Sequence, residues 1–170
     1  MIRFATPADA TRIAEVHVFT WRTAYRGILS DSFLESLSVE QRARGWKHGI
    51  EADPRLVLVA ERDSQIIGWI SVGAGRDDDS KTEGEVYAIY VHPANWSHGI
   101  GRKLMERGED ELWGRGVSRI VLWVLEANRQ ARQFYEALNY VPDSHTKEIT
   151  LGELTLMEVR YEKARKPVSS

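Results

Sequence analysis

The chain has 170 residues, 42% of them hydrophobic, with a formal net charge of -2 and no cysteine. This length and hydrophobic content predict one domain, residues 1–170, and the near-neutral charge gives no global case for binding nucleic acid or an anionic membrane. The absence of cysteine excludes disulfides, thiolate catalysis and thiolate metal sites, and the lack of a secretory signal or a bilayer-length apolar run predicts a soluble cytoplasmic protein.

The first third of the chain predicts a strand and three helices. They cover residues 2–5 (strand), Thr6 to Ala24, 32–37, and Ser38 to Gly49. Thr6 has the form of an N-cap before Pro7, and Ser38-Val39-Glu40-Gln41 is a capping box. Trp21 and Tyr25, at the end of the first helix, either pack into the core or line a substrate entrance.

The middle of the chain predicts a hairpin followed by an acidic loop. Residues 55–61 and 65–72 are strand-like and flank a turn, which favours an antiparallel pair. The polar stretch after them contains Asp77-Asp78-Asp79. Without ligand spacing around it, the run is predicted to be a solvated loop rather than a cation site. The negative charge of this run also suggests a positively charged substrate.

Residues 85–116 give the strongest indication of a binding site. A strand over 85–91 is followed by a loop with Gly99 and Gly101, which opens a helix to about Trp113. Such a helix start presents unpaired N–H groups and the positive end of its dipole to one point, which suits a phosphate or pyrophosphate. Leu104 stands where a dinucleotide fingerprint needs glycine, and Arg102-Lys103-Leu104 does not complete a P-loop. Both of those patterns therefore fail.

The last third predicts a strand, a helix and a closing hairpin. The apolar run 117–125 suggests a strand parallel to the central one, which completes a βαβ unit. Asn128 leads into a helix that carries Tyr135 and is closed by Asn139-Tyr140. Strands around 146–150 and 154–161 follow, and the tail after Glu162 is predicted to fray.

Two motifs resemble one known family. Val86–Pro93 followed by Gly99–Leu104 is similar to the acetyl-CoA motif of the GNAT superfamily of N-acetyltransferases, and Asn128–Tyr140 resembles a second segment of that family. The resemblance covers Ile2 to about Tyr161. It implies a mixed α/β (α+β) fold, with a central, mostly antiparallel twisted sheet that contains one parallel βαβ unit and is flanked by helices.

The resemblance also implies a cofactor, acetyl-CoA, and the residues that hold it. Backbone N–H groups of residues 97–102 would bind the pyrophosphate, main-chain groups near Ile89 to Val91 would hold the pantetheine arm, and Asn128 would contact that arm. Trp96 departs from the family's usual Gln or Arg, and Asn139 from its usual Gly. The predicted cofactor-binding residues are Ile89, Tyr90, Val91, Trp96, Ser97, His98, Gly99, Ile100, Gly101, Arg102, Lys103 and Asn128.

Acetyl transfer to an amine requires a base and an acid. Glu85, or less favourably Glu83, is the candidate base, acting directly or through water; its alternative is a solvated strand-end carboxylate. Tyr135 is the candidate acid for the leaving thiolate, and its alternative is a core tyrosine. Trp21 and Tyr25 are the candidate substrate-binding residues. No histidine spacing indicates a metal site.

The implied function is transfer of acetyl from acetyl-CoA to a primary amine of a small molecule or peptide, by direct attack within a ternary complex. The alternative is a non-catalytic acyl-CoA-binding regulatory module with the same fold. No nucleic acid or membrane partner is expected. Dimerisation is common in the family, and a homodimer is left open.

Overall fold

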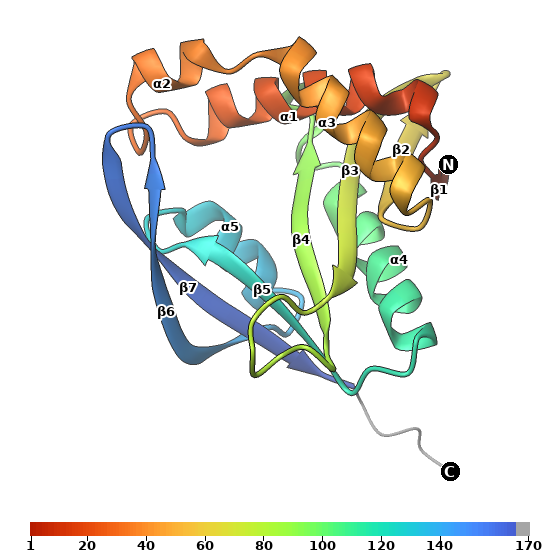
Figure 1. The fold of residues 1–170 in the computed structure, drawn as a ribbon, viewed down its shortest axis with the longest axis vertical. Coiled ribbons are helices and arrows are strands. Elements are labelled where there is room, and N and C mark those ends of the chain that lie inside the picture. The colour runs from red at the N-terminus through yellow and green to blue at the C-terminus, as the bar shows by residue number, and fades with distance from the viewer. Residues whose placement is uncertain (166–170) are drawn as a thin grey trace. The chain divides into compact units, whose positions relative to one another are not determined.

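The computed structural model describes residues 1–165 (Figure 1). Its elements in chain order are β1 (Ile2–Phe4), the 3₁₀ turn η1 (Pro7–Asp9), α1 (Ala10–Ala24), α2 (Asp31–Ser36), α3 (Val39–Ala52), β2 (Val57–Arg62), β3 (Gln65–Ala74), β4 (Gly84–Val91), the 3₁₀ turn η2 (Pro93–Asn95), α4 (Ile100–Gly114), β5 (Arg119–Leu125), α5 (Arg129–Glu136), β6 (Val141–Leu151) and β7 (Leu154–Ala164).

The strands form one sheet in the order β1-β2-β3-β4-β5-β7-β6. The β4–β5 pair is parallel, while β1–β2, β2–β3, β5–β7 and β6–β7 are antiparallel. This topology confirms the predicted mixed α/β fold, with a mostly antiparallel sheet, one parallel pair and flanking helices. Within residues 1–165, no helix has the length and apolarity to cross a membrane.

The chain divides into two compact units. Unit 1 comprises residues 1–72 and 88–108, and unit 2 comprises residues 73–87 and the chain from Glu109 onward. β3, β4 and α4 each contribute residues to both units. The expectation that residues 1–170 fold as one domain stays a prediction, and each unit is described by itself.

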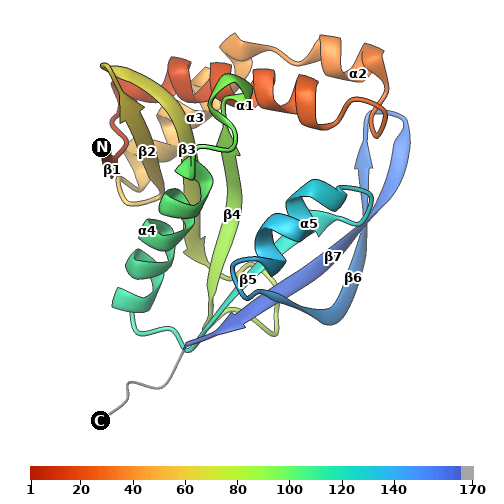
Figure 2. The ribbon, with the colours of Figure 1, turned by 180° about the vertical axis from the view of Figure 1, so that it is seen from behind.

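Unit 1 is layered because β3 alternates between two apolar faces. Trp69 faces α1 and α3: its indole N–H donates to the Ile13 carbonyl at 3.1 Å, and it shares a core cluster with Ile50. The neighbouring residue Ile70 faces α4, where a Cβ added to Gly108 would lie 2.8 Å from its Cδ1. The absence of a side chain at Gly108 therefore permits the close approach of α4 to β3. Figures 1 and 2 show α1 and α3 on one face and the first part of α4 on the other.

The helix starts of unit 1 have N-terminal caps, at the predicted positions Thr6 and Ser38 and also at Ser30. Asp9 accepts the Thr6 N–H at 2.7 Å, and the Ser30 and Ser38 hydroxyl oxygens accept N–H bonds at the starts of α2 and α3. Each bond satisfies an N–H that the helix itself cannot. The third helix continues past its predicted end at Gly49, to Ala52.

In unit 2, α5 covers one face of β5 and β7 (Figure 2). The Arg132 guanidinium donates to the Tyr161 hydroxyl at 3.0 Å, and that hydroxyl donates to the Glu136 carboxylate at 2.7 Å, which ties α5 to β7. After α5, Asn139 adopts φ 67°. Asparagine tolerates this left-handed conformation better than most residues, so it can stand where the family usually has Gly.

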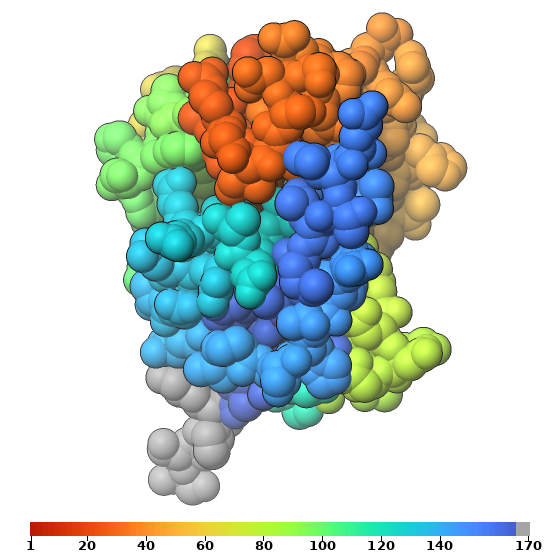
Figure 3. All heavy atoms as spheres, turned by 90° about the vertical axis from the view of Figure 1, so that its left-hand side faces the viewer, coloured from red at the N-terminus to blue at the C-terminus, as the bar shows by residue number. Residues whose placement is uncertain are grey.

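β6 begins earlier than predicted, at Val141 rather than near Thr146. Pro142 pairs with β7, and a register shift separates it from Thr146, with Ser144 at φ 70° between them. Proline is tolerated because β6 is the last strand of the sheet, where a missing N–H breaks no ladder bond. Figure 3 shows the β6–β7 hairpin (blue) at the surface.

β7 extends further than predicted at its C-terminal end. Lys163 pairs with Ile120 and Ala164 with Arg119 on β5. The Arg165 N–H also donates to the Ser118 carbonyl at 2.9 Å. The prediction that the chain frays after Glu162 is therefore wrong for residues 163–165. The rest of the predicted frayed tail, residues 166–170, lies outside the described residues.

Candidate active site

In unit 1, the loop after β4 has the geometry of an anion-binding helix start. Ser97 and Gly99 have left-handed backbone, at φ 64° and 72°. Lys103 N–H bonds back to the Gly99 carbonyl at 3.1 Å. Helix geometry leaves the earlier N–H groups, at Ile100 and Gly101, without an intrahelical acceptor, and the helix dipole adds positive potential there. This arrangement suits a phosphate group.

Side chains of the loop fasten it to its own backbone. The Trp96 indole N–H donates to the Val91 carbonyl at 2.6 Å. The His98 ring nitrogen Nδ1 lies 2.7 Å from the Trp96 carbonyl, and His92 Nδ1 accepts the Ala94 N–H at 3.3 Å. Trp96 therefore holds the loop to the end of β4. The adjacent cations Arg102 and Lys103 are exposed.

The second half of β4 directs alternate backbone groups to its two edges. A Cβ added to Gly68 on β3 would lie 3.0 Å from the Tyr90 carbonyl oxygen, so that carbonyl points toward β3. Because consecutive residues of a strand alternate, the backbone groups of Ile89 and Val91 point to the opposite edge. The β4–β5 ladder has three residue pairs and ends at Val86.

The Val91 carbonyl has no remaining acceptor capacity. It accepts the Thr20 hydroxyl at 3.2 Å and the Trp96 indole N–H at 2.6 Å. A carbonyl oxygen has two lone pairs, so these two donors use both. Of the expected contacts of Val91 with a pantetheine arm, only its N–H is open to a new bond.

Trp21 and Tyr25 belong to an aromatic cluster of unit 1. Their ring centroids are 4.8 Å apart, and the Trp21 ring lies 6.4 Å from that of Tyr90 on β4. Tyr25 is buried, whereas Trp21 is half-buried. The sequence did not single out Arg42, whose guanidinium lies 5.2 Å from the Trp21 ring centroid.

His17 is the buried centre of this cluster. Its ring is stacked on Tyr90 at 5.1 Å and lies 5.4 Å from Trp69. Its Nδ1 accepts the Trp46 indole N–H at 3.4 Å. Burial, helped by the charge of Arg42, lowers the pKa of His17 to about 3, so the imidazole is neutral at physiological pH.

In unit 2, Asn128 and Tyr135 are both buried on α5. Asn128 is the N-cap, and its side-chain oxygen accepts the Ala131 N–H at 3.1 Å. Its amide NH₂ is the part of the side chain that can still recognise a ligand. The Tyr135 carbonyl accepts N–H bonds from Leu138 and Tyr140 at 2.9 and 3.1 Å, which fixes the backbone that carries the phenol.

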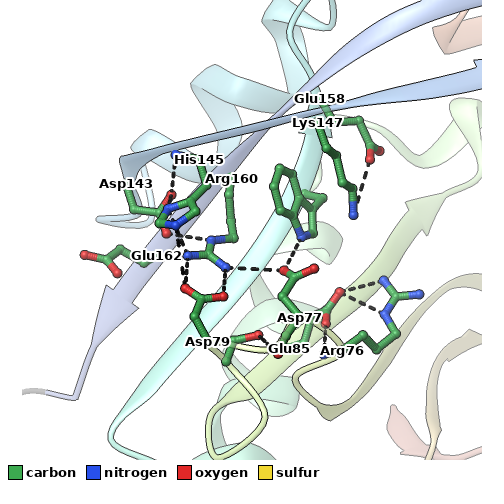
Figure 4. A network of polar contacts seen from close by, with 12 residues as sticks. Arg76, Asp77, Asp79, Glu85, Asp143, His145, Lys147, Glu158, Arg160 and Glu162 are labelled. Atoms are coloured by element: carbon green, nitrogen blue, oxygen red, sulfur yellow. Dashed lines mark hydrogen bonds and ion pairs between the residues drawn. The ribbon is translucent and has the colours of Figure 1, made fainter.

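Glu85 is buried beneath Arg76. Its side chain is 1% exposed, so the alternative of a solvated strand-end carboxylate is wrong. Oε2 accepts the Arg76 N–H at 2.9 Å, and Oε1 accepts two guanidinium N–H groups (Figure 4). A carboxylate has about four acceptor positions, so about one remains open. The guanidinium also lies 4.4 Å from the Tyr87 ring centroid. Glu83 instead accepts the Ser118 hydroxyl at 3.3 Å.

The acidic loop is bound to Arg160, which is 1% exposed (Figure 4). Arg160 donates to Asp77, Asp79 and Asp143, and its bond to Asp79 lowers the pKa of that carboxyl to about 2. The Asp77 and Asp79 side chains are 28% and 46% exposed, so the loop is solvent-accessible as predicted, but the charge of these two residues is compensated by a buried guanidinium that the sequence did not indicate. Asp78, with a side chain 96% exposed, fits the prediction.

A second pair, Glu158 and Lys147, lies on the same side of the unit 2 sheet (Figure 4). The Lys147 ammonium is 3.7 Å from the Glu158 carboxylate and 4.0 Å from the Trp123 ring centroid. Burial raises the pKa of Glu158. Sequence reasoning missed both residues, because an exposed-looking Lys and Glu on two strands give no local signal. Among residues 1–165, no three His, Asp or Glu side chains are arranged to hold a metal ion.

Comparison with known proteins finds acyltransferases, most of them named N-acetyltransferases. The model of the Acetyltransferase (GNAT) family matches residues 8–140. The uncharacterized N-acetyltransferase YuaI of Bacillus subtilis is 34% identical over 143 residues, covering 84% of this chain and 79% of YuaI. The L-amino acid N-acyltransferase MnaT of Escherichia coli is 28% identical, covering 98% and 96% of the two chains. PaiA N-acetyltransferase from Thermoplasma acidophilum, solved in complex with coenzyme A, has the same fold, with a TM-score of 0.76 at 23% identity over 97% and 98% of the chains.

Proposed function

The chain belongs to the GNAT family of acetyltransferases, and from that premise we propose that it transfers acetyl from acetyl-CoA to a primary amine of a small molecule or peptide. The amine attacks the thioester directly in a ternary complex. The observation that carries the proposal is the helix start after β4, where Ser97 and Gly99 turn the backbone so that the N–H groups at Ile100 and Gly101 face outward from the helix end. These groups would bind the pyrophosphate, with Arg102 and Lys103 beside them.

The pantetheine arm would be held by main chain and by one amide. On β4, the Ile89 carbonyl and the Val91 N–H lie on the edge away from β3, where an extended arm could pair with them as a strand would. The NH₂ of Asn128 would donate to a pantetheine carbonyl, since its oxygen already caps α5. Asn128→Asp, which keeps the cap and removes the donor, should therefore weaken coenzyme A binding without unfolding α5.

Glu85 would take the proton that the attacking ammonium must lose. An alkylammonium has a pKa of roughly 10, so attack at neutral pH needs a proton acceptor. The position that Arg76 leaves open on the Glu85 carboxylate would accept a hydrogen bond from the amine or from one bridging water. Arg76 also fixes the carboxylate in orientation through its backbone and guanidinium N–H groups.

Tyr135 would protonate the leaving group. As the tetrahedral intermediate collapses, the C–S bond breaks and the sulfur leaves as a thiolate, which takes the phenol proton of Tyr135. The acylated nitrogen then sheds its second proton, which restores the phenol. A thiol with a pKa of about 8.5 can take a proton from a phenol with a pKa of about 10 when the two are held together. Trp21 and Tyr25 would contact the acceptor.

The test is an acceptor panel that includes amino acids, since the relative MnaT is named for them. Release of coenzyme A thiol is measured, and because the chain has no cysteine, all detected thiol comes from the donor. Tyr135→Phe should lower turnover while coenzyme A still binds by calorimetry. The matched control is Tyr140→Phe, which removes another buried tyrosine hydroxyl from the same unit.

Two outcomes would contradict the proposal. If Tyr135→Phe turns over every acceptor as fast as the wild type, Tyr135 is not the acid. If coenzyme A binds but no amine releases thiol, the chain is an acyl-CoA-binding module without catalysis. Failure to bind coenzyme A at millimolar concentration would remove the basis of the proposal.

A further inference from the structure

Arg42 is a half-buried cation without an anionic partner. It lies on α3 and places its guanidinium 5.2 Å from the Trp21 ring centroid. Within residues 1–165, no carboxylate pairs with it. The acids of the same helix pair elsewhere: Glu40 with Arg44, and Glu51 with Lys47. Buried charges are normally paired, because removing them from water is costly.

The surroundings of Arg42 are electropositive and rich in donors. Burial lowers the pKa of Arg42, as expected of a cation that is partly removed from water and lies over an aromatic ring rather than beside a carboxylate. The neighbouring His17 is neutral but feels the same cation, and the Trp21 indole N–H is buried with no acceptor within the described residues. One cation and one unsatisfied N–H donor therefore lie together, and an anion would satisfy both.

We propose that Arg42, assisted by the Trp21 indole N–H, binds the carboxylate of the acceptor, so that the substrates are amines that also carry a carboxylate. The inference rests on the proposed acetyl transfer and names its substrate class. A planar guanidinium matches a carboxylate through two parallel N–H bonds.

The anion belongs to the acceptor rather than to the cofactor. The phosphates of coenzyme A have their own place at the start of α4, where backbone N–H groups, Arg102 and Lys103 gather. Arg42 comes instead from α3 and faces α1. Tyr90 connects the cluster to the second half of β4: it is an electrostatic neighbour of Arg42, and its ring contacts that of Trp21.

The kinetic test compares amino acids with their amides, which keep the amine and lose the negative charge. The wild type should prefer the acids. Arg42→Gln should raise KM for the acids about tenfold or more, the scale of a lost charge-assisted bidentate pair, and leave KM for the amides and kcat nearly unchanged. Arg44→Gln is the matched control, because Arg44 is exposed on the same helix and pairs with Glu40. Arg42→Lys keeps the charge but loses the planar pair of N–H donors. Its KM for the acids should lie between those of the wild type and Arg42→Gln.

A binding test needs no catalysis. N-acetyl-leucine, a carboxylate without a free amine, is titrated into the full chain while the indole N–H signals are followed by ¹⁵N NMR; Trp21→Phe assigns the signal of Trp21. The Trp21 signal should shift in the wild type and in Arg44→Gln, and should not shift in Arg42→Gln. If this shift occurs while no amine releases thiol, the anion site stands and the proposed acetyl transfer fails.

Three results would overturn the site. The first is equal use of acids and amides by the wild type. The second is an equal rise of KM for acids and amides in Arg42→Gln. The third is a Trp21 shift with inorganic phosphate but with no carboxylate, which would assign the site to a phosphate group. If Arg42→Gln does not fold, two measurements on the wild type still test the proposed carboxylate site: the comparison of acids with amides, and the NMR titration.

Discussion

The buried imidazole of His17 makes a quantitative prediction about acid stability. Its pKa falls to about 3 in the folded protein, because of burial and then the charge of Arg42, against an ordinary value of about 6.5 in the unfolded chain. Between these values the unfolded state binds more protons. The stabilisation is therefore fully present above about pH 6.5 and is lost as the pH falls toward 3.

The size of the effect follows from the two pKa values. Integrating proton binding from about pH 7 to about pH 4.5 gives a loss of about 2.5 kcal/mol of unfolding free energy from this one group. His17→Asn removes the titration, and its amide oxygen can replace Nδ1 as the acceptor of the Trp46 indole N–H. The variant loses packing at every pH, but it should not lose the additional 2.5 kcal/mol.

The assay is guanidinium unfolding of wild type and His17→Asn at both pH values. The carboxylates of the two proteins titrate alike, so the difference between their pH slopes isolates His17. We expect the wild type to lose about 2 to 3 kcal/mol more than the variant on acidification. Parallel slopes would refute the reasoning, because they would show that the imidazole has an ordinary pKa in the folded state.

Three further predictions concern stability and are read from urea unfolding. Gly45→Ala should raise the free energy of unfolding by about 1 kcal/mol, because a Cβ there meets no atom of the described chain within 4 Å. Gly73→Ala should lower the free energy of unfolding, because its Cβ would overlap the Tyr87 ring. Asn139→Ala should lower the free energy of unfolding by about 1 kcal/mol, because residue 139 has left-handed backbone, and Asn139→Gly should not lower it. Equal effects of the two substitutions would contradict this explanation. Arg160→Met should cost about 3 to 5 kcal/mol, since it leaves its carboxylates unpaired, and a loss below about 1 kcal/mol would argue against a buried cation.

The fold was largely predictable because its signals are local. N-caps at Thr6, Ser30 and Ser38 mark helix starts through bonds that span three residues. The glycines of the β4–α4 loop, and the asparagine that ends α5, needed only the backbone conformations that those residues tolerate. Strands β2 and β3 were visible as apolar runs on either side of a turn.

The polar partners of the candidate site were not predictable from local pattern. Asp77 and Arg160 are 83 positions apart, so a run of three aspartates looked solvated although its counter-ion was elsewhere in the chain. Arg76 and Glu85 stand nine positions apart at the two ends of a loop, without helical or strand spacing. Pro142 hid the start of β6, because the edge position that tolerates proline is a property of the whole sheet.

The interruption of β6 has a consequence for association. An outer strand offers its unpaired amides to any second chain, and long flat edges of this kind seed fibrils. Here that edge contains Pro142 and a kink at Ser144, and it carries the charges of Lys147 and Glu148. The opposite edge, β1, is three residues long. Concentrated solutions of this protein should therefore resist edge-to-edge polymerisation.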